Sequence, residues 1–92
     1  MAYKLFYTHS AEKDLSRIDQ KQAAKILMKV DEYLKLPNPL LKAKKLKGFE
    51  ADTYRFRVGD YRVVFRLDEK TGEFVVVVIL KISHRKDVYK EI

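Results

Sequence analysis

Four arginine side chains within residues 54–66 give this sequence its clearest capacity for chemistry. Apolar and charged residues alternate on either side of Gly59-Asp60, a pattern that predicts a β-hairpin with a two-residue turn. In the register of such a turn Arg57 lies opposite Arg62, and alternate side chains share a face. We call this the arginine face, and its members are Arg55, Arg57, Arg62 and Arg66. Like charges directly opposite each other destabilise a sheet by about 0.2–1 kcal/mol per pair, so the pattern favours an anionic partner.

The choice of arginine indicates phosphate groups as that partner. An ordinary solvated sheet face accounts for one or two long cations, but less well for four with a directly opposed pair. The planar guanidinium binds phosphate through two hydrogen bonds and stacks on bases, which lysine does not match. A lysine cluster precedes the hairpin at residues 42–47, and from it we expect Lys45 and Lys47 to add phosphate contacts.

A second candidate group follows the last apolar run, at residues 84–89. If this segment is helical, Arg85 and Tyr89 lie four residues apart on one face, and His84 begins the segment beside the arginine hairpin. A lone histidine or tyrosine is most often structural, but the neighbouring arginine face favours a functional role for both. RNA cleavage needs a base, a proton donor and cations that offset charge on the phosphorane. His84, Tyr89 and either Arg62 or Arg85 would supply these groups without a metal.

Composition excludes several other classes of protein and site. The 92 residues fit one domain, 1–92, and their net charge of +7 suggests nucleic acid or an acidic protein as partner. The chain has no cysteine and only two, widely separated histidines, so we expect neither a metal centre nor a cofactor. Paired carboxylates, a glycine-rich phosphate loop and a serine nucleophile motif are all lacking. No apolar run has the length of a signal peptide or a membrane span, which predicts a cytoplasmic protein without a membrane partner.

The order of elements around these groups predicts an α+β fold. A strand at 3–7 precedes two helices, one capped by Ser10 and one by Asp19, and Pro37-Asn38-Pro39 ends the second. After them we expect a basic connection at 40–53, the arginine hairpin, a turn at 68–72, an apolar strand at 74–80 and a short C-terminal helix. The expected order is β-α-α-β-β-β, with an antiparallel sheet and the N-terminal helical hairpin packed on one face. The arginine face is then left open.

Three segments of the chain together resemble the RelE/ParE superfamily of bacterial and archaeal toxins. They are Lys45-Leu46-Lys47-Gly48, the hairpin from Tyr54 to Phe65, and the stretch from His84 to Tyr89. The resemblance spans nearly the whole chain, and it implies a RelE-like domain that a cognate antitoxin wraps and neutralises in a toxin–antitoxin hetero-oligomer. In the RelE branch it implies an mRNA interferase that cleaves messenger RNA in the A site of the ribosome and so inhibits translation.

The resemblance also implies roles for individual residues. In the RelE branch, basic hairpin residues and a tyrosine near the C-terminus are needed for activity, and His84 matches a histidine that transfers protons in related branches. We therefore expect the catalytic residues to be Arg62, His84, Arg85 and Tyr89. The expected RNA-binding residues are Lys45, Lys47, Arg55, Arg57 and Arg66.

One departure from the RelE pattern narrows these roles. This chain has Arg55 and Arg57 where that pattern often has lysines, and arginine stays protonated and cannot act as a base. Proton transfer would then fall to His84 or Tyr89. Two alternatives remain open: a ParE-like inhibitor of DNA gyrase that is not a nuclease, and a basic module that only binds RNA or a protein partner.

Overall fold

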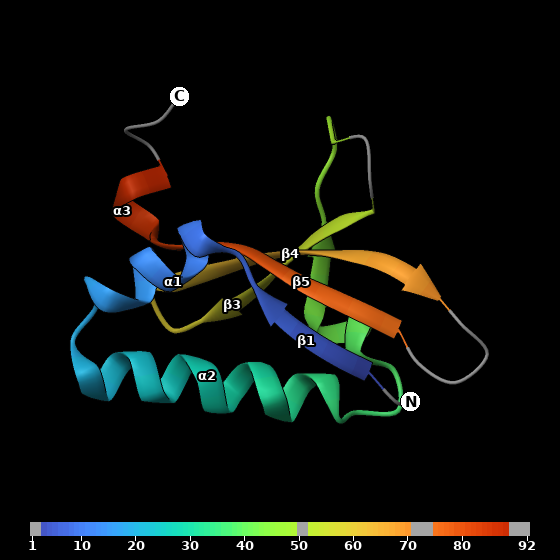
Figure 1. Ribbon diagram of the computed structural model, residues 1–92, viewed down its shortest axis with the longest axis horizontal. Coiled ribbons are helices and arrows are strands. Elements are labelled where there is room, and N and C mark those ends of the chain that lie inside the picture. The colour runs from blue at the N-terminus through green and yellow to red at the C-terminus, as the bar shows by residue number, and fades with distance from the viewer. Residues whose placement is uncertain (1–2, 50–51, 71–74, 89–92) are drawn as a thin grey trace.

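Two helices, α1 and α2, cover one face of a five-stranded sheet in the residues that the computed structural model describes, 3–49, 52–70 and 75–88 (Figure 1). The strands are β1 (Tyr3–Tyr7), β2 (Ala43–Lys45), β3 (Thr53–Val58), β4 (Tyr61–Lys70) and β5 (Val75–His84). The helical elements are α1 (His9–Ser16), α2 (Gln20–Leu34), the 3-10 turn η1 (Pro39–Lys42) and α3 (Arg85–Val88). The expected α+β class and the short C-terminal helix are confirmed. None of these helices has the length and apolar character needed to cross a bilayer.

The sheet is mixed rather than antiparallel, which corrects the expected topology. Its strand order is β1-β5-β4-β3-β2, and β1 pairs in parallel with β5 while the other neighbours are antiparallel. A parallel pair needs a long connection between its strands, and here both helices and the other three strands lie between them in the sequence. β5 therefore lies inside the sheet, between β1 and β4, as its apolar residues on both faces predict.

The caps of the two long helices differ in how well they were predicted. Thr8 rather than Ser10 caps α1, since the Thr8 hydroxyl accepts a hydrogen bond from the Ala11 amide at 3.1 Å and Ser10 lies inside the helix. Asp19 caps α2 as predicted, and its carboxylate accepts a hydrogen bond from the Lys21 amide at 3.2 Å.

Two strands differ in extent from the expected ones. The basic connection at 40–53 contains η1 and the short edge strand β2, whose three residues are too few to show an alternating pattern. β5 continues to His84, four residues beyond the expected end at Leu80. β4 continues to Lys70 and so includes part of the expected turn at 68–72, the remainder of which lies outside the described residues.

The core lies between the helices and the sheet. Phe56 and Phe65, on the neighbouring strands β3 and β4, are fully buried and stack with their ring centroids 4.5 Å apart. From α2, Ile26 and Val30 are buried with them, and Ile79 of β5 completes this centre. Except for Val64, the apolar side chains of the hairpin thus face the helices, which leaves the arginine side chains on the other face.

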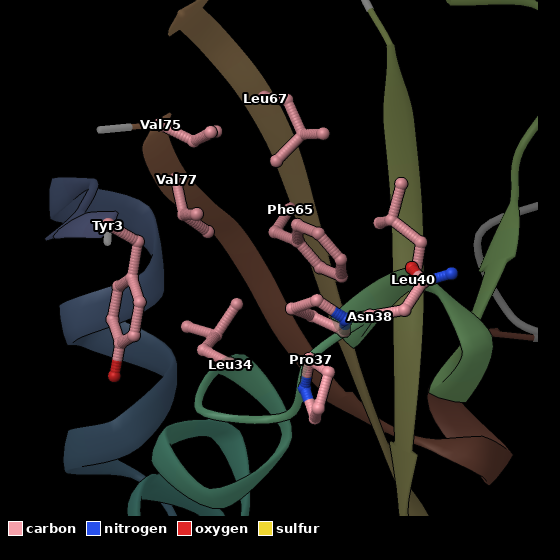
Figure 2. Close-up of a pocket in the computed structure, with 10 residues that line it drawn as sticks. Tyr3, Leu34, Pro37, Asn38, Leu40, Phe65, Leu67, Val75 and Val77 are labelled. Atoms are coloured by element: carbon pink, nitrogen blue, oxygen red, sulfur yellow. The ribbon is translucent and has the colours of Figure 1, made fainter. Parts of the chain in front are cut away.

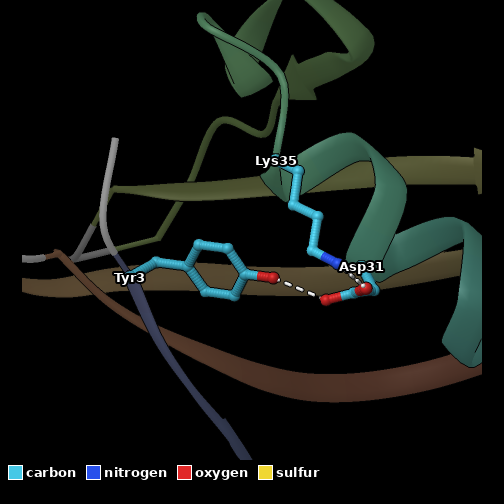
Figure 3. Close-up of polar contacts among 3 residues, drawn as sticks. All are labelled: Tyr3, Asp31 and Lys35. Atoms are coloured by element: carbon cyan, nitrogen blue, oxygen red, sulfur yellow. Dashed lines mark hydrogen bonds and ion pairs between the residues drawn. The ribbon is translucent and has the colours of Figure 1, made fainter.

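A polar cluster joins β1 to α2 at the edge of this core (Figure 3). The Tyr3 hydroxyl donates a hydrogen bond to Asp31 Oδ1 at 2.7 Å, and Lys35 Nζ lies 2.9 Å from Asp31 Oδ2. Partial burial and the Asp31 carboxylate raise the pKa of Tyr3 to about 12. The hydrogen bonds from Lys35 and Tyr3 lower the pKa of Asp31.

Candidate nucleic-acid interface

The hairpin that contains the arginines has the predicted register. Arg57 lies opposite Arg62, and Arg55 lies opposite Val64. Gly59 has a φ of 58°, the left-handed value that the first position of a type II′ turn requires. Because α1 and α2 cover the other face of the sheet (Figure 1), the arginine face is the one opposite these helices.

Positive charge on the arginine face is poorly compensated. Among the described residues, no carboxylate forms an ion pair with Arg55, Arg57 or Arg62. Partial burial lowers the pKa of Arg55, and the positive charges of Arg62 and Arg57 lower it further. Arg66 differs, because its Nε lies 3.4 Å from Asp68 Oδ1. The first three arginines repel one another, and an anionic ligand would relieve that repulsion.

Two lysines on neighbouring strands extend the arginine face. Lys44 of β2 lies opposite Arg55, and Lys81 of β5 lies opposite Val64. Residues paired across a ladder point to the same side of the sheet, so both lysines share the side of the arginines. Neither was among the expected site residues. Lys44 could have been found only from the pairing of β2 with β3, and Lys81 only from an irregularity in β5.

That irregularity is a β-bulge, which turns Lys81 toward the arginine face. Phe65 lies opposite Ile79, whereas the preceding residue, Val64, lies opposite Lys81, so Leu80 is the extra residue. Before the bulge the even-numbered residues of β5 share the side of the arginines, and after it the odd-numbered residues do. After the bulge, β5 therefore places Lys81 and Ser83 on the arginine side, where simple alternation would place Leu80 and Ile82.

α1 and the residue before it hold the bulge in place. Thr8 Oγ1 donates a hydrogen bond to the Leu80 carbonyl at 3.0 Å, and the Thr8 amide donates to the Ile79 carbonyl at 3.0 Å. Asp14 Oδ2 accepts a hydrogen bond from the Ile82 amide at 2.9 Å. These three bonds satisfy backbone groups of the irregular segment from outside β4, which keeps the bulge at one position.

His84 lies at the end of β5, but on the helix side of the sheet. Its Cα is opposite Tyr61, and its ring meets the Tyr61 ring edge-on with centroids 5.2 Å apart. Arg62 points to the other side, so the bulge separates His84 from the arginine side chains that it was expected to neighbour. His84 Nδ1 accepts a hydrogen bond from the Lys86 amide at 3.2 Å. In the neutral imidazole Nε2 therefore holds the proton and is the donor.

Arg85 joins the tail to the turn of the hairpin. The Arg85 amide donates a hydrogen bond to the Asp60 carbonyl at 2.7 Å, and Arg85 Nε lies 3.8 Å from Asp60 Oδ1. This double link fixes the start of α3 beside the Gly59-Asp60 turn. Tyr89, the other expected catalytic residue of the tail, lies outside the described residues.

The two lysines that were predicted to bind RNA are placed differently from the arginines. Lys45 lies opposite Tyr54, on the helix side of the sheet, and its Nζ is 3.6 Å from Asp52 Oδ1. Lys47 is exposed in the bend that follows β2. In this cluster, strand alternation turns Lys44 rather than Lys45 toward the arginine face.

A separate pocket of about 230 Å³ lies on the helix side of the sheet (Figure 2). Leu34 at the end of α2 and Pro37 after it face Phe65 and Leu67 across the pocket. The other lining residues are Tyr3, Asn38, Pro39, Leu40, Val75 and Val77. This mostly apolar lining has no cation to bind a phosphate, so the candidate interface is the arginine face.

Known proteins with similar sequences are toxins of toxin–antitoxin systems. Residues 5–89 match the family model described as ParE toxin of type II toxin-antitoxin system, parDE. The chain is 32% identical over 90 residues to Toxin RelG of Mycobacterium tuberculosis, a match that covers 98% of this chain and 99% of the relative.

Solved structures of the same kind are similar in fold. A chain of the toxin–antitoxin complex RelBE2 from Mycobacterium tuberculosis is 29% identical, with a TM-score of 0.76 and coverage of 92% of this chain and 100% of that one. A chain of the archaeal RelE–RelB complex from Pyrococcus horikoshii is 31% identical, with a TM-score of 0.70 and coverage of 92% and 97%. The isolated E. coli RelE toxin is 26% identical, with a TM-score of 0.67 and coverage of 98% and 94%.

Proposed function

This chain belongs to the RelE/ParE family of type II toxin–antitoxin toxins, and on that premise we propose that it is a metal-independent endoribonuclease that cleaves messenger RNA in the A site of the ribosome. The observation that best supports the proposal is the arginine face, where Arg55, Arg57 and Arg62 have no carboxylate partner among the described residues. Such a surface suits a phosphate backbone. Cleavage of messages on ribosomes would inhibit translation, and the proposed site of this activity is the cytoplasm.

In this proposal the cations and the proton-transfer groups have separate roles. Arg62 and Arg85 offset the charge that develops on the phosphorane, because a guanidinium stays protonated throughout the reaction. Arg55, Arg57 and Arg66 position the RNA, with Lys44 beside Arg55 and with Lys47 as an outer contact. Proton transfer then falls to His84 and Tyr89.

The hydrogen bond at His84 separates the two proton-transfer roles. Its Nδ1 is occupied by the Lys86 amide, so neutral His84 presents an N–H at Nε2. We assign His84 as the proton donor to the leaving oxygen: protonation of Nδ1 gives the imidazolium, which passes its Nε2 proton to that oxygen and returns to a neutral ring. Tyr89 is the base that accepts the proton of the 2′-hydroxyl. His84 lies on the helix side at the end of β5, so the RNA has to bend around this end of the sheet to reach it.

The proposed partner is a cognate antitoxin that forms a hetero-oligomer with this chain. Structures similar to this one were solved as complexes named RelBE2 and RelE–RelB. The net charge of +7 and the exposed arginine face favour a partner that is acidic or amphipathic where it crosses that face. Such a segment would compete with RNA for the same cations.

A second candidate function is non-catalytic inhibition of DNA gyrase. The match of residues 5–89 to the ParE toxin model favours it. It predicts inhibition of supercoiling by the purified chain and no dependence on His84.

The test combines purified chain, ribosomes and a defined message whose A-site codon is set, and maps the 5′ ends of the products. We expect one cut in the A-site codon with wild-type chain and a loss of about 100-fold or more in rate with Arg62→Ala. Lys25→Ala is the matched control, because it removes one exposed cation from α2, away from the arginine face. If the message is not cut and the purified chain inhibits supercoiling by gyrase, the nuclease proposal is rejected and the gyrase-inhibitor function is favoured.

A further inference from the structure

We propose that Lys81 is an additional phosphate-binding residue of the arginine face and that the β-bulge at Leu80 exists to aim it there. This inference rests on the proposed function, because it takes RNA to be the ligand of that face. Lys81 lies on β5, outside the hairpin, opposite Val64. Across the next strand Val64 lies opposite Arg55, so one row across the sheet contains both cations.

The bulge decides which side chains of β5 reach the arginine face. Without it, the alternation that places Val78 opposite Arg66 would continue and would place Leu80 and Ile82 on that face. With the bulge, Ile82 is instead buried in the core at 3% exposure, and Lys81 is half-buried on the arginine side. A single extra residue therefore exchanges an apolar side chain for a cation.

Specific hydrogen bonds from outside the strand support the bulge. Thr8 and Asp14 form three hydrogen bonds with the segment from Ile79 to Ile82, at 2.9–3.0 Å. A bulge of this kind commonly re-aims a side chain beside a functional site. Two of these bonds, from Thr8 Oγ1 to the Leu80 carbonyl and from the Ile82 amide to Asp14 Oδ2, satisfy backbone groups of β5 beyond the end of its pairing with β1.

The position of Lys81 suits a phosphate between it and the hairpin. Arg62 and Arg66 are the residues of β4 on the same face, two positions before and two after Val64, so they are the diagonal neighbours of Lys81. With Arg55, which lies opposite Val64 on β3, four cations therefore surround this one small apolar side chain. A phosphate group above Val64 would meet the guanidinium groups of the neighbouring arginines and the ammonium of Lys81.

The test measures binding of the full chain to a fluorescent single-stranded RNA of about 12 nucleotides, a length within the usual range for such sites. The dissociation constant is measured by anisotropy at several salt concentrations. The slope of log K against log salt is negative, and each lost phosphate contact reduces its magnitude by about 0.7 for single strands. We expect that change for Lys81→Ala and for Lys81→Gln, which keeps the side-chain stem, and a wild-type slope for Lys81→Arg.

Lys25→Ala removes the same charge from the exposed surface of α2 and should keep the wild-type slope. An unchanged slope in Lys81→Ala, an equal loss in Lys25→Ala, or no binding of RNA by the wild-type chain would overturn the proposal. Thermal melting of each variant shows whether it is folded, and Lys81→Arg provides the comparison if the smaller side chains destabilise the sheet.

The outcomes separate this inference from the proposed nuclease function. If the wild-type chain cuts no message but its RNA slope depends on Lys81, the nuclease function fails and the role of Lys81 stands. If the chain cuts messages and Lys81→Ala keeps both slope and rate, Lys81 is a structural residue and the nuclease function stands.

Discussion

Arg57 and Arg62 lie directly opposite each other across β3 and β4, and the charges of both lower the pKa of Arg55. None of the three has a carboxylate partner among the described residues. The folded chain therefore contains a cluster of cations that oppose its own stability. A ligand that binds there gains the attraction of all three charges and removes their mutual repulsion.

Replacing Arg57 with glutamine should raise the free energy of unfolding and weaken RNA binding. The gain comes from lost repulsion with Arg62, about 0.2–1 kcal/mol for a directly opposed pair. Because salt screens exposed charges, the gain should shrink at high salt. Urea denaturation at two salt concentrations measures it, and Lys25→Gln, on the exposed side of α2, should show neither effect. A loss of stability in Arg57→Gln at low salt contradicts the repulsion.

Replacing Asp60 with asparagine should reduce cleavage with little effect on stability. The Asp60–Arg85 ion pair is exposed, and such pairs contribute about 0–1 kcal/mol. The main-chain bond from the Arg85 amide to the Asp60 carbonyl remains, so α3 stays in place while the guanidinium is released.

If this pair positions Arg85 for the reaction, the double variant Asp60→Asn, Arg85→Ala should be no slower than Arg85→Ala alone. Single-turnover cleavage rates test this. Glu32→Gln breaks a comparable exposed pair with Lys29 on α2 and should leave the rate unchanged. Additive losses in the double variant would mean that Asp60 acts independently of Arg85.

Neutral His84 should be protonated at Nε2. The hydrogen bond from the Lys86 amide to His84 Nδ1 favours that tautomer. Long-range proton–nitrogen correlation spectra, recorded at a pH high enough for the imidazole to be neutral, distinguish the two tautomers. His84→Ala should also slow cleavage and leave RNA affinity unchanged, because its side chain lies on the helix side of the sheet. A proton at Nδ1 would reverse the assignment of His84 as donor.

Replacing Asp14 with alanine should loosen the bulge at Leu80. The Ile82 amide would lose its acceptor, at a cost of about 1–3 kcal/mol if the donor stays buried without a partner. Beyond that loss, the RNA salt slope should fall as it does in Lys81→Ala, because the aim of Lys81 depends on the bulge. Asp14→Asn keeps an oxygen acceptor and should restore the slope. A slope that Asp14→Ala leaves unchanged would show that Thr8 suffices to hold the bulge.

The sequence predicted the part of the site that local rules determine. A two-residue turn sets the pairing of a hairpin, so the opposition of Arg57 and Arg62 followed from spacing alone. The bulge at Leu80 could not be found in this way, because the run before it is apolar on both faces and shows no alternation. It depends on contacts with Thr8 and Asp14, which are 72 and 68 residues away in the sequence from their partners.

The edges of the sheet were unpredicted for a related reason. The parallel pairing of β1 with β5 joins segments from near the two ends of the described chain. The three residues of β2 are too few to show a strand pattern in the sequence. Because β2 was not predicted, its lysines could not be assigned to one or the other face of the sheet. Lys45 was therefore predicted to bind RNA, whereas the register of β2 places Lys44 on the arginine face. Pairing between distant segments, rather than local pattern, decides these positions.

The contribution of Tyr3 to stability should disappear at alkaline pH. The pKa of Tyr3 is raised from 10.0 to about 12 in the folded chain, by partial burial first and then by the Asp31 carboxylate. A raised pKa stabilises the fold fully below pH 10, and that stabilisation is lost as the pH rises toward 12. Tyr3→Phe lacks both the hydrogen bond and the titration. Its deficit in the free energy of unfolding, measured by urea denaturation, should therefore be largest near neutral pH and shrink above pH 10. A deficit that stays constant across this range would show that the phenol does not change its protonation on unfolding.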